Sequence, residues 1–258
     1  MTAAASDLAD GARGRPAGVQ PPPSWVRGAT PPGDATFLHE MVAAHAPTEM
    51  LELGVASGVS SAYLLHALDT LPAGERPRRL RSCDVTPTCY FDPARATGDA
   101  VRTMYPQPRT TWVLDTDTDA RRLSQALPAG SVDLTFIDAN HYHPWPLLDL
   151  LHVSVLARRQ SWIILHDIDL PRVAPRYAAW GAKWLFDQWP FEKVAGGQQQ
   201  NVGAVRLPAD LTTLLPLART LLARPWEHAP TRWHVALPAP FSALDATLDA
   251  QLEAAAAR

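Results

Sequence analysis

A run of small residues at a change of sequence pattern is the first feature that could hold a ligand. In "LELGVASGVSSAYLLHAL", residues 51–68, a strand-like stretch passes through a corner into a helix-like stretch, and Glu52 lies two residues before the first glycine. The corner contains four small residues, Gly54, Ala56, Ser57 and Gly58. Small residues at such a corner let backbone amides approach a nucleotide or an amino-acid moiety, helped by the helix N-terminus. The alternative is a tight strand-to-helix turn without a ligand.

Acidic side chains follow the next two strand-like stretches. Asp84 ends "RSCDVT", where a carboxylate suits a bidentate hydrogen bond to ribose hydroxyls. The alternative for Asp84 is an N-cap of a following helix. Asp115 and Thr116 end the third stretch and are placed to border an adenine ring. A helix-capping role explains these later acids equally well.

The elements that must position these side chains alternate along the chain. Predicted strands cover residues 49–55, 79–86, 110–115, 131–139 and 160–168. Predicted helices cover residues 34–46, 60–71, 93–105, 118–127, 144–157 and 172–189. This alternation predicts an α/β fold with a parallel sheet covered on both faces. Residues 191–197 and 201–208 add a terminal antiparallel hairpin. Ligands bind beyond the carboxyl ends of such strands, so the corner and the acids are expected at one edge.

The first motif also allows a comparison with known families. Glu52-x-Gly54-x-x-x-Gly58 differs from the dehydrogenase fingerprint, because Ala56 stands where the second glycine would be. It resembles the first motif of class I S-adenosylmethionine-dependent methyltransferases, over about residues 34–208. The resemblance implies a Rossmann-like, doubly wound, seven-stranded, mostly parallel sheet and S-adenosylmethionine as cofactor. The residues implied to bind this cofactor are Glu52, Gly54, Ala56, Ser57, Gly58, Asp84, Asp115, Thr116 and Asp138.

Two later strings sharpen the resemblance. "FIDANHYHPWPLLDLL" and "SWIILHDID" are similar to bacterial small-molecule and antibiotic O-methyltransferases, in which I-D-x-x-H follows strand four and H-D ends strand five. Several members bind a divalent metal. By position, the implied ligands are Asp138, His166 and Asp167. An acid usually occupies the position of His166, and histidine shifts the preference from Mg²⁺ toward Mn²⁺, Fe²⁺ or Zn²⁺.

His141 lies three residues after Asp138, and in this setting both are implied to be catalytic. The methyl donor is an activated sulfonium, whereas a protonated hydroxyl is a poor nucleophile. A neutral imidazole can take the proton of that hydroxyl at physiological pH, so His141 is the expected general base. The alternative for His141 is a cap of the following helix.

Composition excludes several classes of protein. The chain has 258 residues, a net charge of −3 and two cysteines. It therefore shows no electrostatic basis for nucleic-acid binding and no disulfide framework. The sequence shows neither a membrane-length apolar run nor a secretion signal. We expect a cytoplasmic protein without a membrane partner.

The two ends of the chain differ from the middle. Residues 1–33 are rich in Ala, Gly and Pro, which predicts a flexible arm. Trp25 and Val26 of this arm could still dock on a surface or cover a site, and the arm could contribute to a homodimer. Residues 34–208 form the predicted methyltransferase domain. Residues 209–258 form a predicted helical extension that could be a lid or a dimer contact. One stripe of this extension carries Phe241, Leu244, Leu248 and Leu252, which is typical of core or of a homodimer interface.

The motifs together predict O-methylation of a small, secondary-metabolite-like acceptor. Three alternatives stay open. They are an N-methyltransferase, a nucleotide-dependent oxidoreductase and a non-catalytic binding protein on the same fold. Aromatic residues near the strand ends could contact the acceptor, although most aromatic residues in helices are core. These candidates are Tyr90, Phe91, Tyr142, Trp145, Tyr177, Trp180 and Trp184.

Overall fold

A seven-stranded sheet in the order β5-β2-β1-β6-β7-β9-β8 forms the centre of the protein. The structure is a computed structural model and describes residues 15–230 and 236–256. The strands are β1 (Glu49–Leu53), β2 (Arg79–Cys83), β5 (Thr111–Asp115), β6 (Val132–Ile137), β7 (Ala157–His166), β8 (Lys193–Gly196) and β9 (Val202–Arg206). The first five strands in this order, β5, β2, β1, β6 and β7, are parallel, whereas β9 is antiparallel to both β7 and β8. The predicted mostly parallel sheet with a terminal antiparallel hairpin is confirmed.

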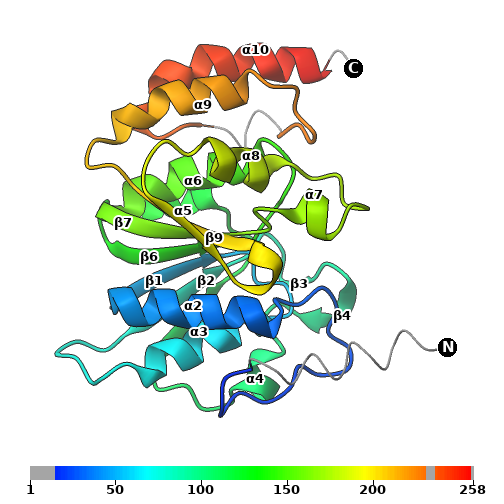
Figure 1. The fold of residues 1–258 in the computed structure, drawn as a ribbon, viewed down its shortest axis with the longest axis vertical. Helices are drawn as coiled ribbons and strands as arrows, with labels where there is room; N and C mark the ends of the chain where they lie inside the picture. Colours follow the sequence, from blue (N-terminus) through cyan, green and yellow to red (C-terminus); the bar gives the residue numbers. More distant parts are fainter. Residues whose placement is uncertain (1–14, 231–235, 257–258) are drawn as a thin grey trace.

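Helices cover both faces of the sheet (Figure 1). The α-helices up to β8 are α2 (Pro32–His45), α3 (Val59–Thr70), α4 (Val101–Met104), α5 (Ala120–Ala126), α6 (Trp145–Leu156), α7 (Leu170–Val173) and α8 (Gly181–Gln188). Met50 of β1 packs in one core cluster with α2 and α3, and the next residue, Leu51, packs in a second cluster with α6 and α8. Successive residues of a strand point to opposite faces, so both faces of the sheet are buried.

The C-terminal residues form an outer layer beyond α8, at the top of Figure 1. The layer contains the helices α9 (Leu215–Leu222) and α10 (Asp245–Ala256). Its apolar stripe, Phe241, Leu244, Leu248 and Leu252, is buried in the same cluster as the apolar side chains of α6. These four side chains are therefore core within this chain.

Two predicted helices are wrong. Residues 93–105 contain β4 (Asp92–Ala96), which pairs with β3 (Thr88–Cys89), and only the short α4 is helical. Gly98 is the physical reason, because its φ of +79° is outside the helical region and a Cβ there would lie 2.8 Å from the Trp112 ring. Residues 172–189 are likewise not one helix: α7 ends at Val173 and α8 begins at Gly181.

The segment before α2 packs on the domain. A flexible arm was predicted over residues 1–33, but within its described part Val19 is buried and the Gln20 amide donates to the Met104 carbonyl at 2.9 Å. The Trp25 ring lies 6.4 Å from the Phe91 ring of the β3–β4 hairpin. Residues 15–31 are therefore anchored by a few apolar side chains, such as Val19 and Trp25, within a segment that is otherwise rich in Ala, Gly and Pro. Residues 1–14 lie outside the described residues.

Candidate functional site

The corner between β1 and α3 is closed tightly by the protein's own backbone. Gly54 has φ +86°, and a Cβ there would lie 2.1 Å from the Asp138 carbonyl oxygen. Gly58 has φ +91°, and its Cβ would lie 2.8 Å from the Gly98 Cα. The Gly98 amide also donates to the Ala56 carbonyl at 2.9 Å. The small residues predicted to admit a ligand are thus required first by neighbouring chain segments, and Gly54 brings β1 directly beside Asp138.

Glu52 supports this corner from inside the core. Its side chain is fully buried and accepts hydrogen bonds from the hydroxyls of Ser60 and Ser61 at 2.6 Å each and of Ser82 at 2.5 Å. Burial raises the pKa of Glu52 to about 7, against the lowering effect of the three hydroxyls. Because Glu52 has no exposed surface, its carboxyl group cannot contact a ligand directly. It can influence binding only by holding the corner in shape.

Asp84 ties the end of β2 to the same corner. Its Oδ2 accepts from the Val55 amide at 3.0 Å and from the Ala56 amide at 2.9 Å. Its Oδ1 accepts from the Thr86 amide at 3.1 Å. The element after Asp84 is the strand β3, so the alternative role of helix cap does not apply. The partly exposed carboxylate stays at the carboxyl edge of the sheet, next to Val85, whose side chain is 66% exposed.

Asp115 and Thr116 end β5 beside Asp84. The Asp84 amide donates to the Asp115 carbonyl at 3.0 Å, and the Asp115 carboxylate pairs with Arg81. Helix capping is the role of Asp119, whose side chain accepts from the Arg122 amide at the start of α5. The structure therefore leaves Asp115 and Thr116 at the carboxyl edge of the sheet, where the Asp115 carboxylate forms an ion pair with Arg81.

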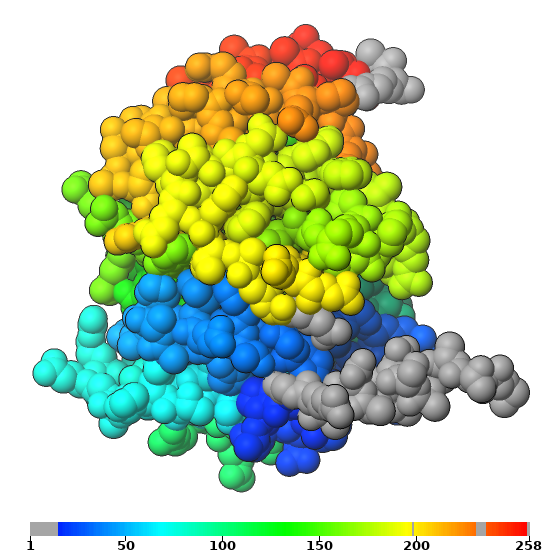
Figure 2. Space-filling view, in the orientation of Figure 1, coloured from blue at the N-terminus to red at the C-terminus, as the bar shows by residue number. Residues whose placement is uncertain are grey.

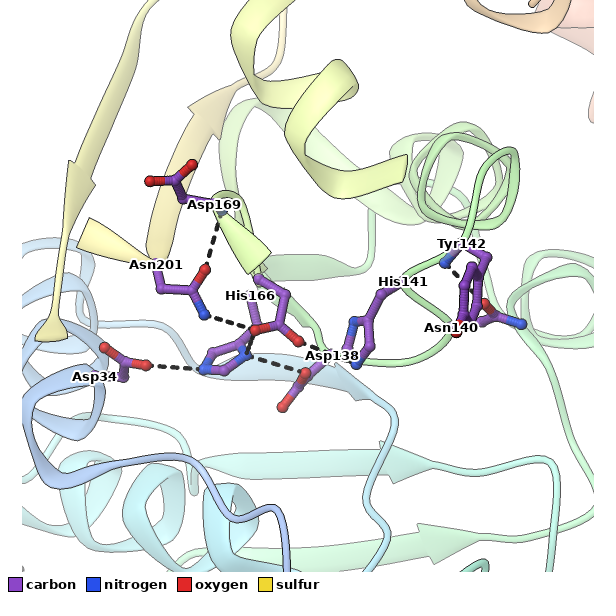
Figure 3. Close-up of polar contacts among 9 residues, drawn as sticks. Asp34, Asp138, Asn140, His141, Tyr142, His166, Asp169 and Asn201 are labelled. Carbon is purple, nitrogen blue, oxygen red and sulfur yellow. Dashed lines mark hydrogen bonds and ion pairs between the residues drawn. The ribbon is translucent and has the colours of Figure 1, made fainter. Parts of the chain in front are cut away.

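An acid–imidazole cluster lies at the ends of β6 and β7 (Figure 3). It consists of Asp34, Asp138, His141, His166 and Asp167. His141 Nε2 lies 3.1 Å from Asp167 Oδ2. His166 Nδ1 lies 3.3 Å from one oxygen of Asp138 and 3.3 Å from one oxygen of Asp167. His166 Nε2 lies 3.0 Å from Asp34 Oδ2. The sequence predicted that Asp138, His141, His166 and Asp167 would converge, and the structure brings all four together.

Electrostatics inside the cluster favour charged side chains. Burial opposes the imidazolium form of His166, but Asp138 and Asp167 raise its pKa well above the usual value. Burial also opposes ionisation of Asp167, yet His166, His141 and Asn201 hold its pKa well below the usual range. Asn201 Nδ2 donates to Asp167 at 2.6 Å. The cluster therefore contains fixed charge of both signs beside the glycine corner.

The donor atoms that could hold one cation differ from the predicted set. Those of Asp138, His141 and Asp167 all lie within 4.8 Å of one another. Both ring nitrogens of His166 instead face carboxylates of the protein. Asp167 has φ +59°, a turn that follows directly on the last residue of β7. The geometry therefore favours His141 in the ligand position that the resemblance gave to His166.

Two residues of the site gave no usable signal in the sequence. Asp34 was interpreted as a helix cap, but α2 begins at Pro32 and the Asp34 side chain contacts His166 across 132 positions of the chain. Asn201 lies between β8 and β9 and binds both Asp167 and the Asp169 amide. Contacts between residues so distant in sequence have no spacing rule, so only the folded chain reveals them.

Comparison with known proteins agrees with this architecture. Residues 51–168 match the sequence model of a family described as a methyltransferase domain. No curated protein matches the chain. Cofactor-bound Rv0187 from MTB is 18% identical, with a TM-score of 0.51, over 80% of this chain and 87% of that one. SAH-bound methyltransferase PaMTH1 from Podospora anserina is 13% identical, with a TM-score of 0.50, over 69% and 79%.

A third solved structure is the O-methyltransferase from Bacillus cereus in complex with SAH. It is 16% identical, with a TM-score of 0.49, over 79% of this chain and 86% of that one. None of the helices in the described residues combines the length and the apolar character that a membrane span requires. The family match over residues 51–168, on this fold, supports a class I S-adenosylmethionine-dependent methyltransferase.

Proposed function

We propose that the protein transfers the methyl group of S-adenosylmethionine to a hydroxyl of a small-molecule acceptor, with His141 as general base. The observation that carries the proposal is the position of His141. Its ring lies 3.1 Å from Asp167 and beside Asp138, at the strand end that borders the glycine corner. A carboxylate that orients an imidazole is a recurring arrangement for proton abstraction.

The residues at the corner fit S-adenosylmethionine. Thr86 Oγ1 lies 2.8 Å from the Thr88 carbonyl and 3.2 Å from Asp84 Oδ1. A hydroxyl has one proton, and the shorter contact takes it, so Asp84 Oδ1 keeps a lone pair for a ribose hydroxyl. The exposed Val85 offers an apolar contact for an adenine ring, next to Thr116 on the neighbouring strand end. Glu52 acts indirectly, by holding the corner.

The acid–imidazole cluster fits the reacting end. When bound, S-adenosylmethionine supplies a sulfonium with an electrophilic methyl group. Asp138 and Asp167 provide negative charge near the position of that group. His141 Nε2 lies 3.1 Å from Asp167 Oδ2, and a proton held on Nε2 by this carboxylate would leave Nδ1 with the lone pair that accepts the proton of the acceptor hydroxyl. His141 thereby raises the nucleophilicity of the acceptor oxygen.

A divalent cation is the second candidate for activating the acceptor, because the donors of Asp138, His141 and Asp167 converge. A set of two carboxylates and one imidazole suits Mn²⁺, Fe²⁺ or Zn²⁺ and would lower the pKa of a bound hydroxyl. The charged His166 ring, 3.3 Å from both carboxylates, opposes a second cation. A metal bound to His141 Nε2 would replace the contact of this nitrogen with Asp167, so a metal held there excludes the arrangement proposed for the base. We therefore rank the metal-free base first.

Aromatic side chains exposed near the cluster support an acceptor with an apolar part. Tyr90 is 75% exposed and Tyr177 is 47% exposed. Partial desolvation raises the pKa of Tyr90, and the nearby Tyr177 and Asp138 raise it further. A ring or aliphatic part of the acceptor that packs against Tyr90 and Tyr177 would bury apolar surface of these side chains that is now exposed to solvent.

Binding of the methyl donor tests the first half of the proposal. Isothermal titration with S-adenosylmethionine should show one site per chain. NAD serves as the matched competitor, because the corner lacks the second glycine of the dehydrogenase pattern. Preference for NAD over S-adenosylmethionine would refute the proposed cofactor.

Turnover tests the second half. Matched panels of alcohols, phenols and amines are incubated with S-adenosylmethionine, and release of S-adenosylhomocysteine is measured together with product mass. Methylated hydroxyl compounds are expected, in the presence of excess EDTA as in its absence. Methylation of amines alone would replace the proposed O-transfer by N-transfer. Complete loss in EDTA, with recovery on adding Mn²⁺, would favour the cation mode.

A further inference from the structure

Asp34 is a buried carboxylate at the active-site end of α2 that the proposed chemistry does not use. Its side chain is fully buried, although it comes from the helix that precedes the sheet. Its Oδ2 lies 3.0 Å from His166 Nε2. Because a carboxylate oxygen accepts hydrogen bonds, His166 Nε2 is the donor. A charge-assisted contact of this kind holds the ring in one orientation.

The loop between β8 and β9 presses on the same carboxylate. A Cβ at Gly197 would lie 2.3 Å from Asp34 Oδ1, so the Gly197 backbone touches this oxygen closely. In Figure 2 the yellow surface of this loop lies directly against the blue surface of α2. Asp34 is therefore fixed between the loop on one side and His166 on the other.

The rigid imidazole of His166 connects Asp34 with the reacting centre (Figure 3). The ring nitrogen that does not face Asp34, Nδ1, lies 3.3 Å from both Asp138 and Asp167. Equal distances to two carboxylates mean that a small rotation of the ring would favour one and release the other. The contact between Nε2 and Asp34 prevents that rotation.

We propose that Asp34 is a positioning residue of the methyl-transfer centre, which acts through His166 to hold Asp138 and Asp167 in place. The inference rests on the proposed function. Asp34 lies outside residues 51–168, the segment that matches the methyltransferase-domain family. Asn201, just before β9, supports the same arrangement, since its side-chain amide donates to Asp167 at 2.6 Å. Asp167 is thus held directly by Asn201 from beyond the matched segment, whereas Asp138 is reached from Asp34 only through His166.

The variant Asp34→Asn tests the inference, because it keeps the size of the side chain and removes its charge. We expect kcat for the acceptor found in the panel to fall about 10–100-fold, the usual cost of a misplaced catalytic group. The dissociation constant for S-adenosylmethionine should change less than about threefold, because the corner is untouched. Steady-state kinetics and titration separate these effects.

A spectroscopic measurement makes the test independent of turnover. In protein with ¹⁵N-labelled histidine, the Nε2–H resonance of His166 is assigned by its loss in His166→Gln. It should shift upfield in Asp34→Asn, because the charged acceptor is gone. The matched control is Asp69→Asn, a buried carboxylate that binds Tyr105 and Thr110 away from the cluster. The control should lower the melting temperature but leave the resonance and the kcat of folded protein unchanged.

A second variant covers the case in which Asp34→Asn does not fold. Gly197→Ala keeps the Asp34 carboxylate but crowds both it and the Val202 side chain, and it should shift the same resonance. An unshifted resonance together with wild-type kcat in a folded variant would overturn the inference. The inference would also be overturned if Asp69→Asn lowered kcat as much as Asp34→Asn does, because the loss would then reflect stability alone. If wild-type protein binds no S-adenosylmethionine, the proposed function fails, whereas the resonance still reports the contact between Asp34 and His166.

Discussion

The glycine corner and the acid–imidazole cluster lie side by side but are built in opposite ways. The corner is held by uncharged partners: its supporting carboxylates, Glu52 and Asp84, accept hydrogen bonds from serine hydroxyls and from the Val55 and Ala56 amides. The cluster is assembled from Asp34, from the ends of β6 and β7, and from the β8–β9 connection. The two regions meet where Gly54 touches the backbone of Asp138.

The contrast shows that an acid at a strand end does not by itself indicate a reactive group. Glu52 and Asp167 are both largely buried. All contacts of Glu52 are with hydroxyls of the core, whereas Asp167 faces the partly exposed His141. The partners of a carboxylate, more than its burial, therefore distinguish a supporting acid from one that orients a base. Four variants can break or sharpen this distinction.

The largest effect is expected at the corner, from Gly54→Ala. A Cβ at 2.1 Å from a backbone carbonyl cannot be relieved by moving a side chain, and φ +86° adds strain. We expect a loss of more than about 4 kcal/mol in the free energy of unfolding, measured by chemical denaturation. The matched control is Gly130→Ala, with φ +68° and no atom within 4 Å, which should cost only about 1–2 kcal/mol. Equal losses in the two variants would mean that the corner is not tightly closed.

In the cluster, His141→Ala should act on chemistry and spare stability. Loss of a general base is expected to lower turnover about 10²–10⁴-fold, with affinity for S-adenosylmethionine nearly unchanged. The control is His45→Ala, at the opposite end of α2 from Asp34. A folded His141→Ala protein with near wild-type turnover would remove this residue from the mechanism.

Glu52→Gln should change how the stability of the protein depends on pH. The raised pKa means that folded protein keeps this proton up to about pH 7, whereas the unfolded chain releases it near pH 4.5. The folded state binds more protons between these values, so this group makes stability fall as pH rises from about 4.5 to 7. Relative to wild type, Glu52→Gln should gain stability between pH 5 and pH 8, by at most about 3 kcal/mol. Melting curves that shift in parallel at every pH would contradict the raised pKa.

The smallest effect is expected from Asp84→Ala. The change removes the contact proposed for ribose and releases the Val55 and Ala56 amides. Affinity for S-adenosylmethionine should weaken by about 1–3 kcal/mol, measured by titration calorimetry. Glu75→Ala, which removes an exposed acid, controls for net charge. Unchanged affinity in Asp84→Ala would confine this carboxylate to holding the corner.

Much of the fold follows from the sequence, because its signals are local. Apolar strands alternating with helices predict a parallel sheet, and the corner, the acid at the end of β2 and the I-D-x-x-H string have fixed spacings. The failures have local causes as well. Gly98 and the β3–β4 hairpin interrupt residues 93–105, where propensity alone predicted a helix. Burial of Val19 likewise anchors a segment whose composition predicted mobility.

The sequence by itself determined which strand-end residues lie at the carboxyl edge of the sheet. The parallel direction of the strands fixes that edge, and it follows from the alternation of strands and helices. Only the tertiary structure decided what each residue does there. The direction of the His166 ring depends on Asp34, 132 positions earlier, and the turn at Asp167 sets the distance to His141. Spacing along the chain specifies neighbours within an element, whereas side-chain orientation at a strand end is set by partners that only packing brings into contact.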